Sequence, residues 1–386
     1  MASYDIAVHG TVAEGFDGVR EEFAAVLAEE NSEPGAQLAA YLDGRPVVDL
    51  WAGDGITGDA LPAVFSSTKG AAHLVVALLV QDGVLDLDRH ITAYWPEFTG
   101  GGKERLTLRD VLAHSAGLIG ADGGFTLDEL ADDRVVAARL AGQRPHWEPG
   151  TAFGYHALTI GALTGEVVRR ATGRSVQELF EERVRAPYGL DFHLGLPEAL
   201  EGRYVPIRPM VPTPEQVAEL RANDAGPDSM IAIAFNAGAR SPVDLVTFVN
   251  SRTTRALSPA SVGGVASARG LAGMYAAVVG GLDGRAPLLK PETLAEFGRP
   301  HLLGTDVVTG SVDGFGLGFE RARQSYPFLG EGSIGHAGAA GSQSFADPVN
   351  GVAYGYTRRT CAYPGGAAPE NVRLARAVIR AAAAVR

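Results

Sequence analysis

The sequence predicts an α+β fold, in which strands from the two ends of the chain form one sheet and helices from the middle form a second lobe. Strand-like patterns occur at residues 37–52 and again at residues 342–358, and each has a turn signal at its centre. Most segments between them have the apolar period of helices. The terminal strands need each other to complete a sheet, so we expect the helices to form an insertion between them.

The first elements in the chain are a hairpin and a buried helix. Residues 37–42 and 46–51 are apolar and flank Asp43-Gly44, a strong signal for a hairpin turn. Residues 66–82 form a nearly all-apolar run, which predicts a buried helix with Gly83 just beyond its end.

The remaining elements follow in the order helices, strands, helix. We expect a short helix at 106–112, a longer one at 158–171 ending near Gly173, and further helices at 127–140, 176–184, 214–221, 242–249 and 268–279. Strands are expected at 316–320, 342–347 and 351–358, with residues 348–351 as a second hairpin turn and 370–384 as a closing amphipathic helix. This order predicts an α/β lobe of residues 1–75 and 285–386 and a mainly helical lobe of residues 76–284. Together they would form one unit, with any functional site between the lobes.

The composition is typical of a soluble globular protein and argues against several other classes of protein. The chain has 386 residues and a formal net charge of −12, which disfavours a nucleic-acid or anionic-membrane surface. Cys361 is the only cysteine, so no intrachain disulfide is possible. Residues 1–5 do not resemble a secretory signal, and no stretch approaches the roughly 20 apolar residues of a membrane span. We therefore expect a cytoplasmic location.

The sequence Ser66-Ser67-Thr68-Lys69, at the start of the buried helix, is the strongest chemical signal. The chain has only three lysines (Lys69, Lys103 and Lys290), and a lysine inside a buried helix is costly unless it is paired or functional. Residues three apart share a helix face, so the hydroxyl of Ser66 and the amine of Lys69 are expected to meet. The pair then provides a nucleophile and a group that accepts its proton.

Such a pair needs a second acid or base and a set of oxyanion donors. Tyr155, in a turn-rich segment before a helix, is the candidate acid or base, and a cationic Lys69 nearby would favour its phenolate form. A half-buried tyrosine that closes a turn remains the alternative. Residues 335–341 are glycine-rich and precede a strand, so their backbone N–H groups are candidate oxyanion donors. A simple turn with a surface histidine remains the alternative there.

Other signals favour no further chemistry. We expect His114 to order a loop rather than to take part in catalysis. The chain contains no Gly-x-Ser-x-Gly, His-Glu-x-x-His, paired-cysteine or P-loop pattern, so we expect no metal and no cofactor. Residues 314–318 lack the spacing of a dinucleotide-binding loop and are better explained as a close-packed strand.

Taken together, these motifs resemble those of the serine β-lactamase-like superfamily. They are Ser66-x-x-Lys69, residues 106–118, Pro149-Gly150-Thr151 with Tyr155, and His336-Ala337-Gly338, and the resemblance covers roughly residues 15–380. It is closest to the class C β-lactamases and the family VIII carboxylesterases. It implies the β-lactamase/penicillin-binding-protein-like fold, an antiparallel sheet flanked by helices with an inserted mainly helical lobe.

The resemblance also implies a role for each site residue. Ser66 would form an acyl-enzyme, with Lys69 and Tyr155 as acid and base, and the backbone N–H groups of Ser66 and Ala339 would form the oxyanion hole. We expect the substrate to be bound by His336, Ala337, Gly338 and His156.

Two departures from the class C pattern point to an ester substrate. Ala157 stands where those enzymes have an asparagine, and His336 stands where they have a lysine. The site then lacks partners for the amide and the carboxylate of a β-lactam, so we predict a carboxylesterase that acts on a small-molecule short-chain or aryl ester. A β-lactamase or D-Ala-D-Ala peptidase, an acyltransferase that uses the same acyl-enzyme, and a non-enzymatic binding protein are the alternatives. The acyl chain, the alcohol and the oligomeric state are left open.

Overall fold

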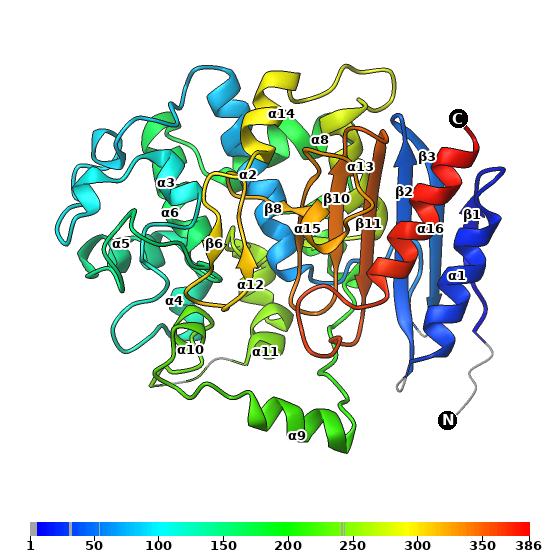
Figure 1. The fold of residues 1–386 in the computed structure, drawn as a ribbon, viewed down its shortest axis with the longest axis horizontal. Helices are drawn as coiled ribbons and strands as arrows, with labels where there is room; N and C mark the ends of the chain where they lie inside the picture. Colours follow the sequence, from blue (N-terminus) through cyan, green and yellow to red (C-terminus); the bar gives the residue numbers. More distant parts are fainter. Residues whose placement is uncertain (1–5, 31–32, 54, 241, 243) are drawn as a thin grey trace.

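The computed structural model describes residues 6–30, 33–53, 55–240, 242 and 244–386, and its central element is a seven-stranded antiparallel sheet (Figure 1). The strand order is β1-β3-β2-β11-β10-β9-β8. The strands are β1 (His9–Val12), β2 (Gly35–Leu42), β3 (Arg45–Gly53), β8 (Glu320–Arg321), β9 (Ile334–Ala337), β10 (Gln343–Asp347) and β11 (Val352–Arg358). Since β2 pairs with β11, the two ends of the chain meet in one sheet, as predicted.

Both predicted hairpins are present, and their turns have the expected chemistry. Asp43 and Gly44 have φ angles of +48° and +77°, which are the positive values that a two-residue hairpin turn of this hand requires. Gly351, in the turn between β10 and β11, also has a positive φ of 60°. Residues that tolerate this conformation therefore set the register of both strand pairs.

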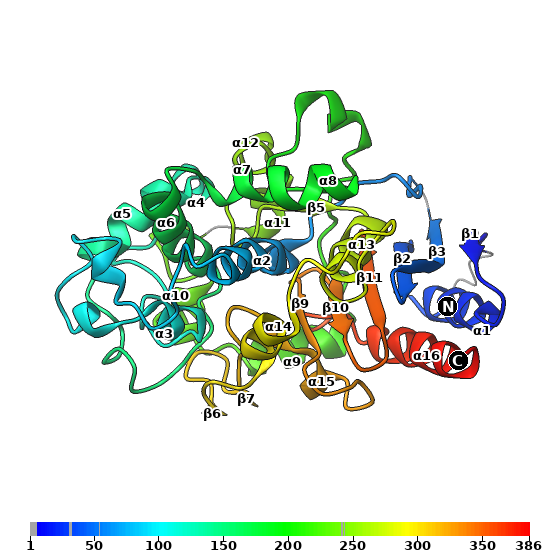
Figure 2. The ribbon, with the colours of Figure 1, turned by 90° about the horizontal axis from the view of Figure 1, so that it is seen from above.

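Helices cover both faces of the sheet (Figure 2). Helices α1 (Asp17–Ala28) and α16 (Asn371–Ala384) lie on one face, where Phe23, Leu27 and Leu374 share a core with residues of the central strands. Helix α13 (Ala268–Val279) packs against β2, β10 and β11 on the other face. Helix α13 thus belongs with the sheet, although it lies within residues 76–284, which we expected to form the helical lobe.

Most of the other helices form the second part of the molecule, on the left in Figure 1, whereas α15 (Ala322–Ser325) contacts β9 of the sheet. The remaining helices are α3 (Leu108–Leu112), α4 (Leu127–Ala131), α5 (Asp133–Gly142), α6 (Ile160–Thr172), α7 (Val176–Phe180), α8 (Ala186–Tyr188), α9 (Pro214–Ala222), α10 (Met230–Ala234), α11 (Leu245–Asn250), α12 (Arg252–Leu257) and α14 (Pro291–Gly298). Short strand pairs are formed by β4 (Phe192–His193) with β5 (Val265–Ala266), and by β6 (Gly304–Thr305) with β7 (Val312–Asp313).

The structure corrects the boundaries of several predicted elements. The segment 127–140 forms two helices because Asp132 has an extended backbone and its side chain accepts the Arg134 N–H, which starts α5. The segment 316–320 was expected to be a strand, but only Glu320–Arg321 pairs in the sheet. Gly316 N–H instead bonds to Phe319 O and closes a turn, in which Gly318 has φ +75°. Strand β1 and helix α1 were not predicted.

Helix α2 (Thr68–Gln81) lies between the sheet and the helical part, and it contacts β9 on one side and α6 and α7 on the other. All of its residues except the last two are buried, and Gly83, with φ +72°, follows its end as predicted. The start of α2 is therefore held between the two parts of the fold. Within the described residues, no helix has both the length and the apolar character of a membrane span. Residues 1–5, which we expected not to be a signal, lie outside the described residues.

Candidate active site

Ser66 lies in a 3₁₀ turn, Phe65–Ser67, that leads directly into α2. Phe65 has φ +47°, a conformation that costs free energy for a residue with a side chain and that recurs at functional sites. Ser67 is fully buried, and its hydroxyl is used within the protein, where it bonds to His336 O and Ser342 Oγ. Ser115 is also buried and donates to Asp110 O. Of these three serines, only Ser66 has its hydroxyl beside Lys69.

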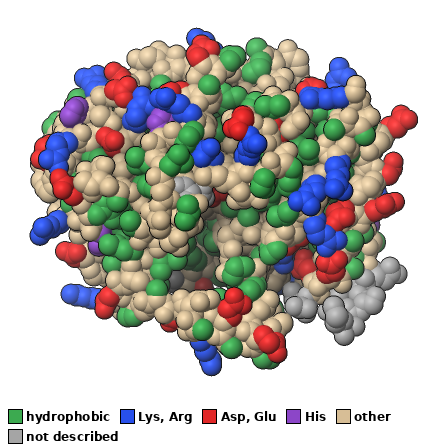
Figure 3. Space-filling model, in the orientation of Figure 1, with side chains coloured by type: hydrophobic (Ala, Val, Ile, Leu, Met, Phe, Trp, Pro, Cys, Tyr) green, Lys and Arg blue, Asp and Glu red, His purple; other side chains and the backbone are tan. Residues whose placement is uncertain are grey.

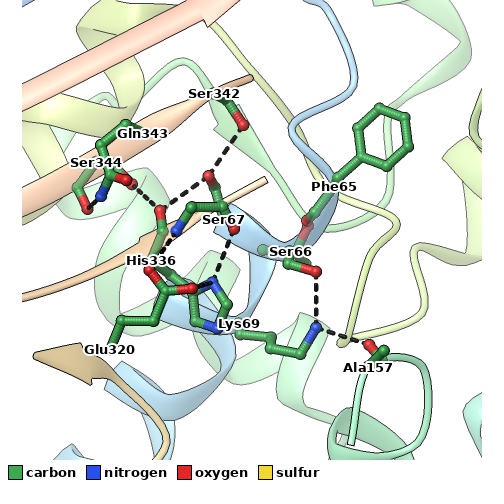
Figure 4. A network of polar contacts seen from close by, with 12 residues as sticks. Phe65, Ser66, Ser67, Lys69, Ala157, Glu320, His336, Ser342, Gln343 and Ser344 are labelled. Atoms are coloured by element: carbon green, nitrogen blue, oxygen red, sulfur yellow. Dashed lines mark hydrogen bonds and ion pairs between the residues drawn. The ribbon is translucent and has the colours of Figure 1, made fainter. Parts of the chain in front are cut away.

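Lys69 reaches the Ser66 hydroxyl as the sequence spacing predicts (Figure 4). Its Nζ donates to Ser66 Oγ at 2.9 Å, to Ala157 O at 2.8 Å and to Ser261 O at 2.8 Å. The side chain is fully buried, and none of these acceptors is a carboxylate. Burial therefore lowers the pKa of Lys69 to about 7, although Glu320 opposes the shift. Near neutral pH the amine can take the proton of Ser66.

Tyr155 lies on the same side of the site as Lys69, whose Nζ is 5.0 Å from the centroid of the tyrosine ring. Phe315 stacks on Tyr155 with ring centroids 5.9 Å apart, and His336 packs nearby at 6.1 Å. Desolvation raises the pKa of Tyr155 well above its ordinary value, Glu320 adds to the shift, and a hydrogen bond with Ser66 opposes it. Desolvation therefore favours the protonated hydroxyl of Tyr155 over the phenolate that we expected.

The third motif, His336-Ala337-Gly338, forms the end of β9 and the turn after it. The His336 side chain is buried, and its Nδ1 lies 2.8 Å from Ala337 O and 3.3 Å from Glu320 Oε1. Burial holds the pKa of His336 well below its ordinary value, and Lys69 adds to the shift, so the imidazole is neutral. A side chain at Gly338 would collide with Val64 O, 2.3 Å from the position of its Cβ. This close contact holds the turn against the segment before Ser66.

We expect the backbone N–H groups of Ser66 and Ala339 to bind an oxyanion. Ser66 N–H and Ala339 N–H have no hydrogen-bond acceptor within the described part of the chain. Ala339 is partly exposed, and Ser66 retains 9% of its surface. Donors that are fixed but unused in the free enzyme are what a developing negative charge requires.

His156 does not take the role that we expected. It is fully buried, its Nδ1 lies 2.7 Å from Gly154 O, and its Nε2 accepts the Leu118 N–H. Both ring nitrogens are used, so none remains for a substrate, and His156 instead connects two loops. His114 orders the same region as predicted, since its Nδ1 accepts the His156 N–H.

Several residues of the site were not found from the sequence. Ser261 contributes only a backbone carbonyl to Lys69, a role that any residue type can fill. Phe315 lies in the glycine-rich segment 314–318, which we took for a close-packed strand. Gly318 in that segment has no space for a side chain because His73 lies against it. Glu320 follows at the start of β8. Nothing in the sequence around this glutamate indicated that it would lie at the site.

Figure 3 shows a recess in the lower middle of the face of the molecule that it draws. Among the residues that the structure describes, no group of three or more histidine, cysteine, aspartate or glutamate side chains is arranged to hold a metal ion. The arrangement of the site fits nucleophilic attack by Ser66 with proton transfer by Lys69 and Tyr155.

Comparisons with known proteins show what the sequence and the fold are similar to. The sequence model of the family described as Beta-lactamase matches residues 20–374. The esterase/beta-lactamase LipL of Mycobacterium tuberculosis is 31% identical over 381 residues, which cover 90% of this chain and 82% of that protein. The structure of EstA from Arthrobacter nitroguajacolicus has a TM-score of 0.88 and 41% identity, covering 97% of this chain and 98% of the other. A family VIII carboxylesterase has a TM-score of 0.86 and 31% identity, covering 97% and 100%.

Proposed function

Since the chain belongs to the beta-lactamase family, we propose that it is a serine carboxylesterase of that family and hydrolyses small-molecule esters through an acyl-enzyme on Ser66. The observation that carries the proposal is the buried Lys69, with a pKa of about 7 and its Nζ 2.9 Å from Ser66 Oγ. A base near the working pH is the most effective kind. Relatives that are named as esterases over nearly the whole chain support the choice of substrate.

The first half of the reaction forms the acyl-enzyme. Neutral Lys69 removes the proton of Ser66 as its oxygen attacks the ester carbonyl. The N–H groups of Ser66 and Ala339 receive the negative charge of the tetrahedral intermediate. Protonated Tyr155 then donates its proton to the leaving alcohol, and Lys69 returns a proton to Tyr155. Ser66 now carries the acyl group.

The second half releases the acid. A water molecule takes the place of the alcohol and attacks the acyl carbonyl, while Tyr155 takes its proton and passes its own proton to Lys69. Lys69 gives that proton to Ser66 Oγ as the acyl bond breaks, so the acid is released and Ser66, Lys69 and Tyr155 return to their starting states. The third motif acts through its backbone. The turn at Gly338 fixes the position of Ala339, whose N–H donates a hydrogen bond to the oxyanion. His336 is buried and contributes by packing against Tyr155 rather than by binding a charged substrate group.

Two features of the site favour an ester over a β-lactam. The Ala157 side chain is an apolar methyl group, and its carbonyl already accepts a bond from Lys69. The neutral His336 offers no cation to a carboxylate. Each missing charged hydrogen bond is worth roughly 1.5–3 kcal/mol, so the two together are expected to lower the efficiency for lactams by about two to four powers of ten.

The test combines labelling with a substrate comparison. A fluorophosphonate probe should label the peptide containing Ser66; Ser66→Ala should lose both labelling and turnover, while the neighbouring Ser67→Ala keeps its label. For the same preparation, kcat/KM for p-nitrophenyl acetate or butyrate should exceed that for nitrocefin. Labelling at Ser67 or Ser115 would contradict the assignment of Ser66 as the nucleophile. A kcat/KM that is higher for nitrocefin than for the esters would show that the protein is a β-lactamase rather than an esterase.

A further inference from the structure

The turn that follows β9 carries Ala339, and two of its carbonyl groups are bonded to a segment near the C-terminal end of the chain. Ala340 O accepts the Ala362 N–H at 2.9 Å, and Gly341 O accepts the Ala368 N–H at 3.1 Å. These carbonyls belong to the two residues after Ala339. Since peptide units are planar, only a few backbone torsions separate them from the Ala339 N–H. The position of this N–H therefore depends on residues far from the third motif in the sequence.

Asn371, the first residue of α16, adds a side-chain bond to the same turn. Its Nδ2 donates to Gly341 O at 3.1 Å and to Ala368 O at 3.0 Å, and its Oδ1 accepts the Tyr354 hydroxyl at 2.8 Å. The side chain is fully buried, so the amide is shielded from solvent. Both amide hydrogens and the oxygen are used, and the opposite orientation of the amide would place Oδ1 against two carbonyl oxygens.

The groups around this amide are themselves held firmly. Tyr354 lies on β11, is fully buried and stacks on Phe345 of β10 with ring centroids 4.9 Å apart. Gly341, with φ +117°, approaches Arg358 so closely that a Cβ would lie 2.5 Å from the arginine Cδ. The turn is thus packed against Arg358 and bonded to Asn371, which together fix it relative to β11 and α16.

We propose that Asn371 is a positioning residue of the oxyanion hole, whose amide holds the turn where the Ala339 N–H can receive the charge of the tetrahedral intermediate. The proposal rests on the proposed esterase function. Asn371 is buried and acts through Gly341. Complete loss of an oxyanion donor typically costs about 10²- to 10³-fold in rate. Because two backbone N–H groups still hold the turn without the amide, we expect a smaller loss, about 10- to 100-fold.

The experiment compares Asn371→Leu with Asn250→Leu, since leucine has the branched shape of asparagine but no polar atoms. Asn250, at the end of α11, is the matched control: its Oδ1 accepts the Tyr204 hydroxyl and its Nδ2 donates to Ile207 O. Each protein is titrated to completion with a fluorophosphonate, so that rates are expressed per labelled Ser66. Asn371→Leu should lower kcat for p-nitrophenyl acetate by about 10- to 100-fold with little change in KM. Asn250→Leu should leave both quantities unchanged.

A second measurement tests the oxyanion hole itself. Benzeneboronic acid adds to Ser66 Oγ, the hydroxyl proton passes to Lys69, and the resulting tetrahedral anion mimics the intermediate. Because such an analogue is bound by the interactions of the transition state, its affinity should fall in Asn371→Leu by the same factor as kcat/KM. In Asn250→Leu the affinity should stay the same. A purely structural role of Asn371 would lower the fraction of protein that is labelled and would change neither quantity per labelled site.

The outcomes separate this inference from the proposed function. A loss confined to the labelled fraction, or a fall in kcat without a matching fall in the affinity for the boronic acid, would overturn the role of Asn371 and leave the esterase intact. Equal losses in the two leucine variants would do the same. Absence of ester hydrolysis by the wild-type enzyme would instead overturn the proposed function.

If Asn371→Leu does not fold, Tyr354→Phe decides. This variant keeps the ring that stacks on Phe345 and removes only the bond to the oxygen of the Asn371 amide. Since the amide then has lost one of its anchors, kcat and the affinity for the boronic acid should both fall by one shared factor, smaller than that in the leucine variant. Unchanged values of both quantities contradict the proposal.

Discussion

Lys69 and Lys103 are both buried, at 0% and 1% exposure, yet only Lys69 is placed for chemistry. Lys103 donates to the carbonyl oxygens of Leu140, Ala141 and Gln143, at the C-terminal end of α5. A cation there satisfies the free carbonyls and interacts favourably with the helix dipole. Lys69 also has three acceptors, but one of them is a hydroxyl that can lose its proton. Burial of a lysine therefore does not identify a base; the chemical nature of its acceptors does.

The largest effect is expected for Lys69→Met. The substitution keeps the length and the apolar stem of the side chain but removes the base, so kcat/KM for a p-nitrophenyl ester should fall by about 10³-fold or more. Turnover should be normalised to the amount of folded protein, measured by circular dichroism. A loss of less than tenfold would mean that Ser66 is activated by another group.

Tyr155→Phe should cost about 10²- to 10³-fold in kcat, because the leaving alcohol loses its proton donor while the ring packing against Phe315 is kept. In the double variant with Lys69→Met, the loss should be little greater than that in Lys69→Met alone, since groups that act as one unit are strongly non-additive. Losses that multiply would show that the two residues act independently. Steady-state kinetics of the four proteins measure this directly.

Lys103→Met should show the opposite pattern to Lys69→Met. Three carbonyl groups, two buried and one partly buried, lose their donor, and leaving a buried group unsatisfied costs about 1–3 kcal/mol before relaxation. We expect the free energy of unfolding to fall by about 2–4 kcal/mol, with kcat per labelled Ser66 unchanged. Lys290→Met is the matched control, because Lys290 is exposed, and it should change neither quantity. A kcat defect in Lys103→Met would remove the distinction between the two buried lysines.

The sequence predicted the parts of this site that depend on local spacing. Ser66 and Lys69 meet because they are three residues apart on a helix, and Tyr155 is found from the turn-rich segment before α6. The carbonyl of Ser261 is 192 residues from Lys69 in the chain and carries no side-chain signal. The pKa of Tyr155 depends on packing by Phe315 and on the charge of Glu320, which only the folded chain brings together.

In the fold, too, the elements with local sequence signals were predicted and those that depend on distant contacts were not. The hairpins and helices α2, α6, α13 and α16 have strong local signals, and all are present within one or two residues of their predicted bounds. Helix α1 also has a helical pattern in the sequence, since its buried residues lie at helical spacing; they are Val19, Phe23, Val26 and Leu27. Its position could therefore have been predicted. Strand β8 could not have been predicted, because two residues pair with β9 only after a turn that is built around His73.

The smallest predicted effect is the pH dependence of the unfolding free energy that Lys69 causes. The pKa of Lys69 is about 7 in the folded protein, below its ordinary value of 10.5. Between these two values the unfolded chain binds a proton that the folded chain does not bind, so the free energy of unfolding rises with pH. The slope from this group is at most about 1.4 kcal/mol per pH unit. Below pH 7 both states are protonated, and the slope from Lys69 disappears.

The difference in unfolding free energy between the wild-type protein and Lys69→Met isolates this contribution, since all other groups are common to both. We expect the difference to be constant from pH 5 to about 6.5 and then to shift in favour of the wild type toward pH 9, as measured by urea unfolding. The same ionisation should appear in catalysis, where wild-type kcat/KM falls tenfold per pH unit below about 7. Because the pKa of Tyr155 is raised, no alkaline loss from that group is expected up to pH 9. A flat stability difference together with a pH-independent kcat/KM would show that Lys69 does not change its protonation state near neutral pH and is not the base.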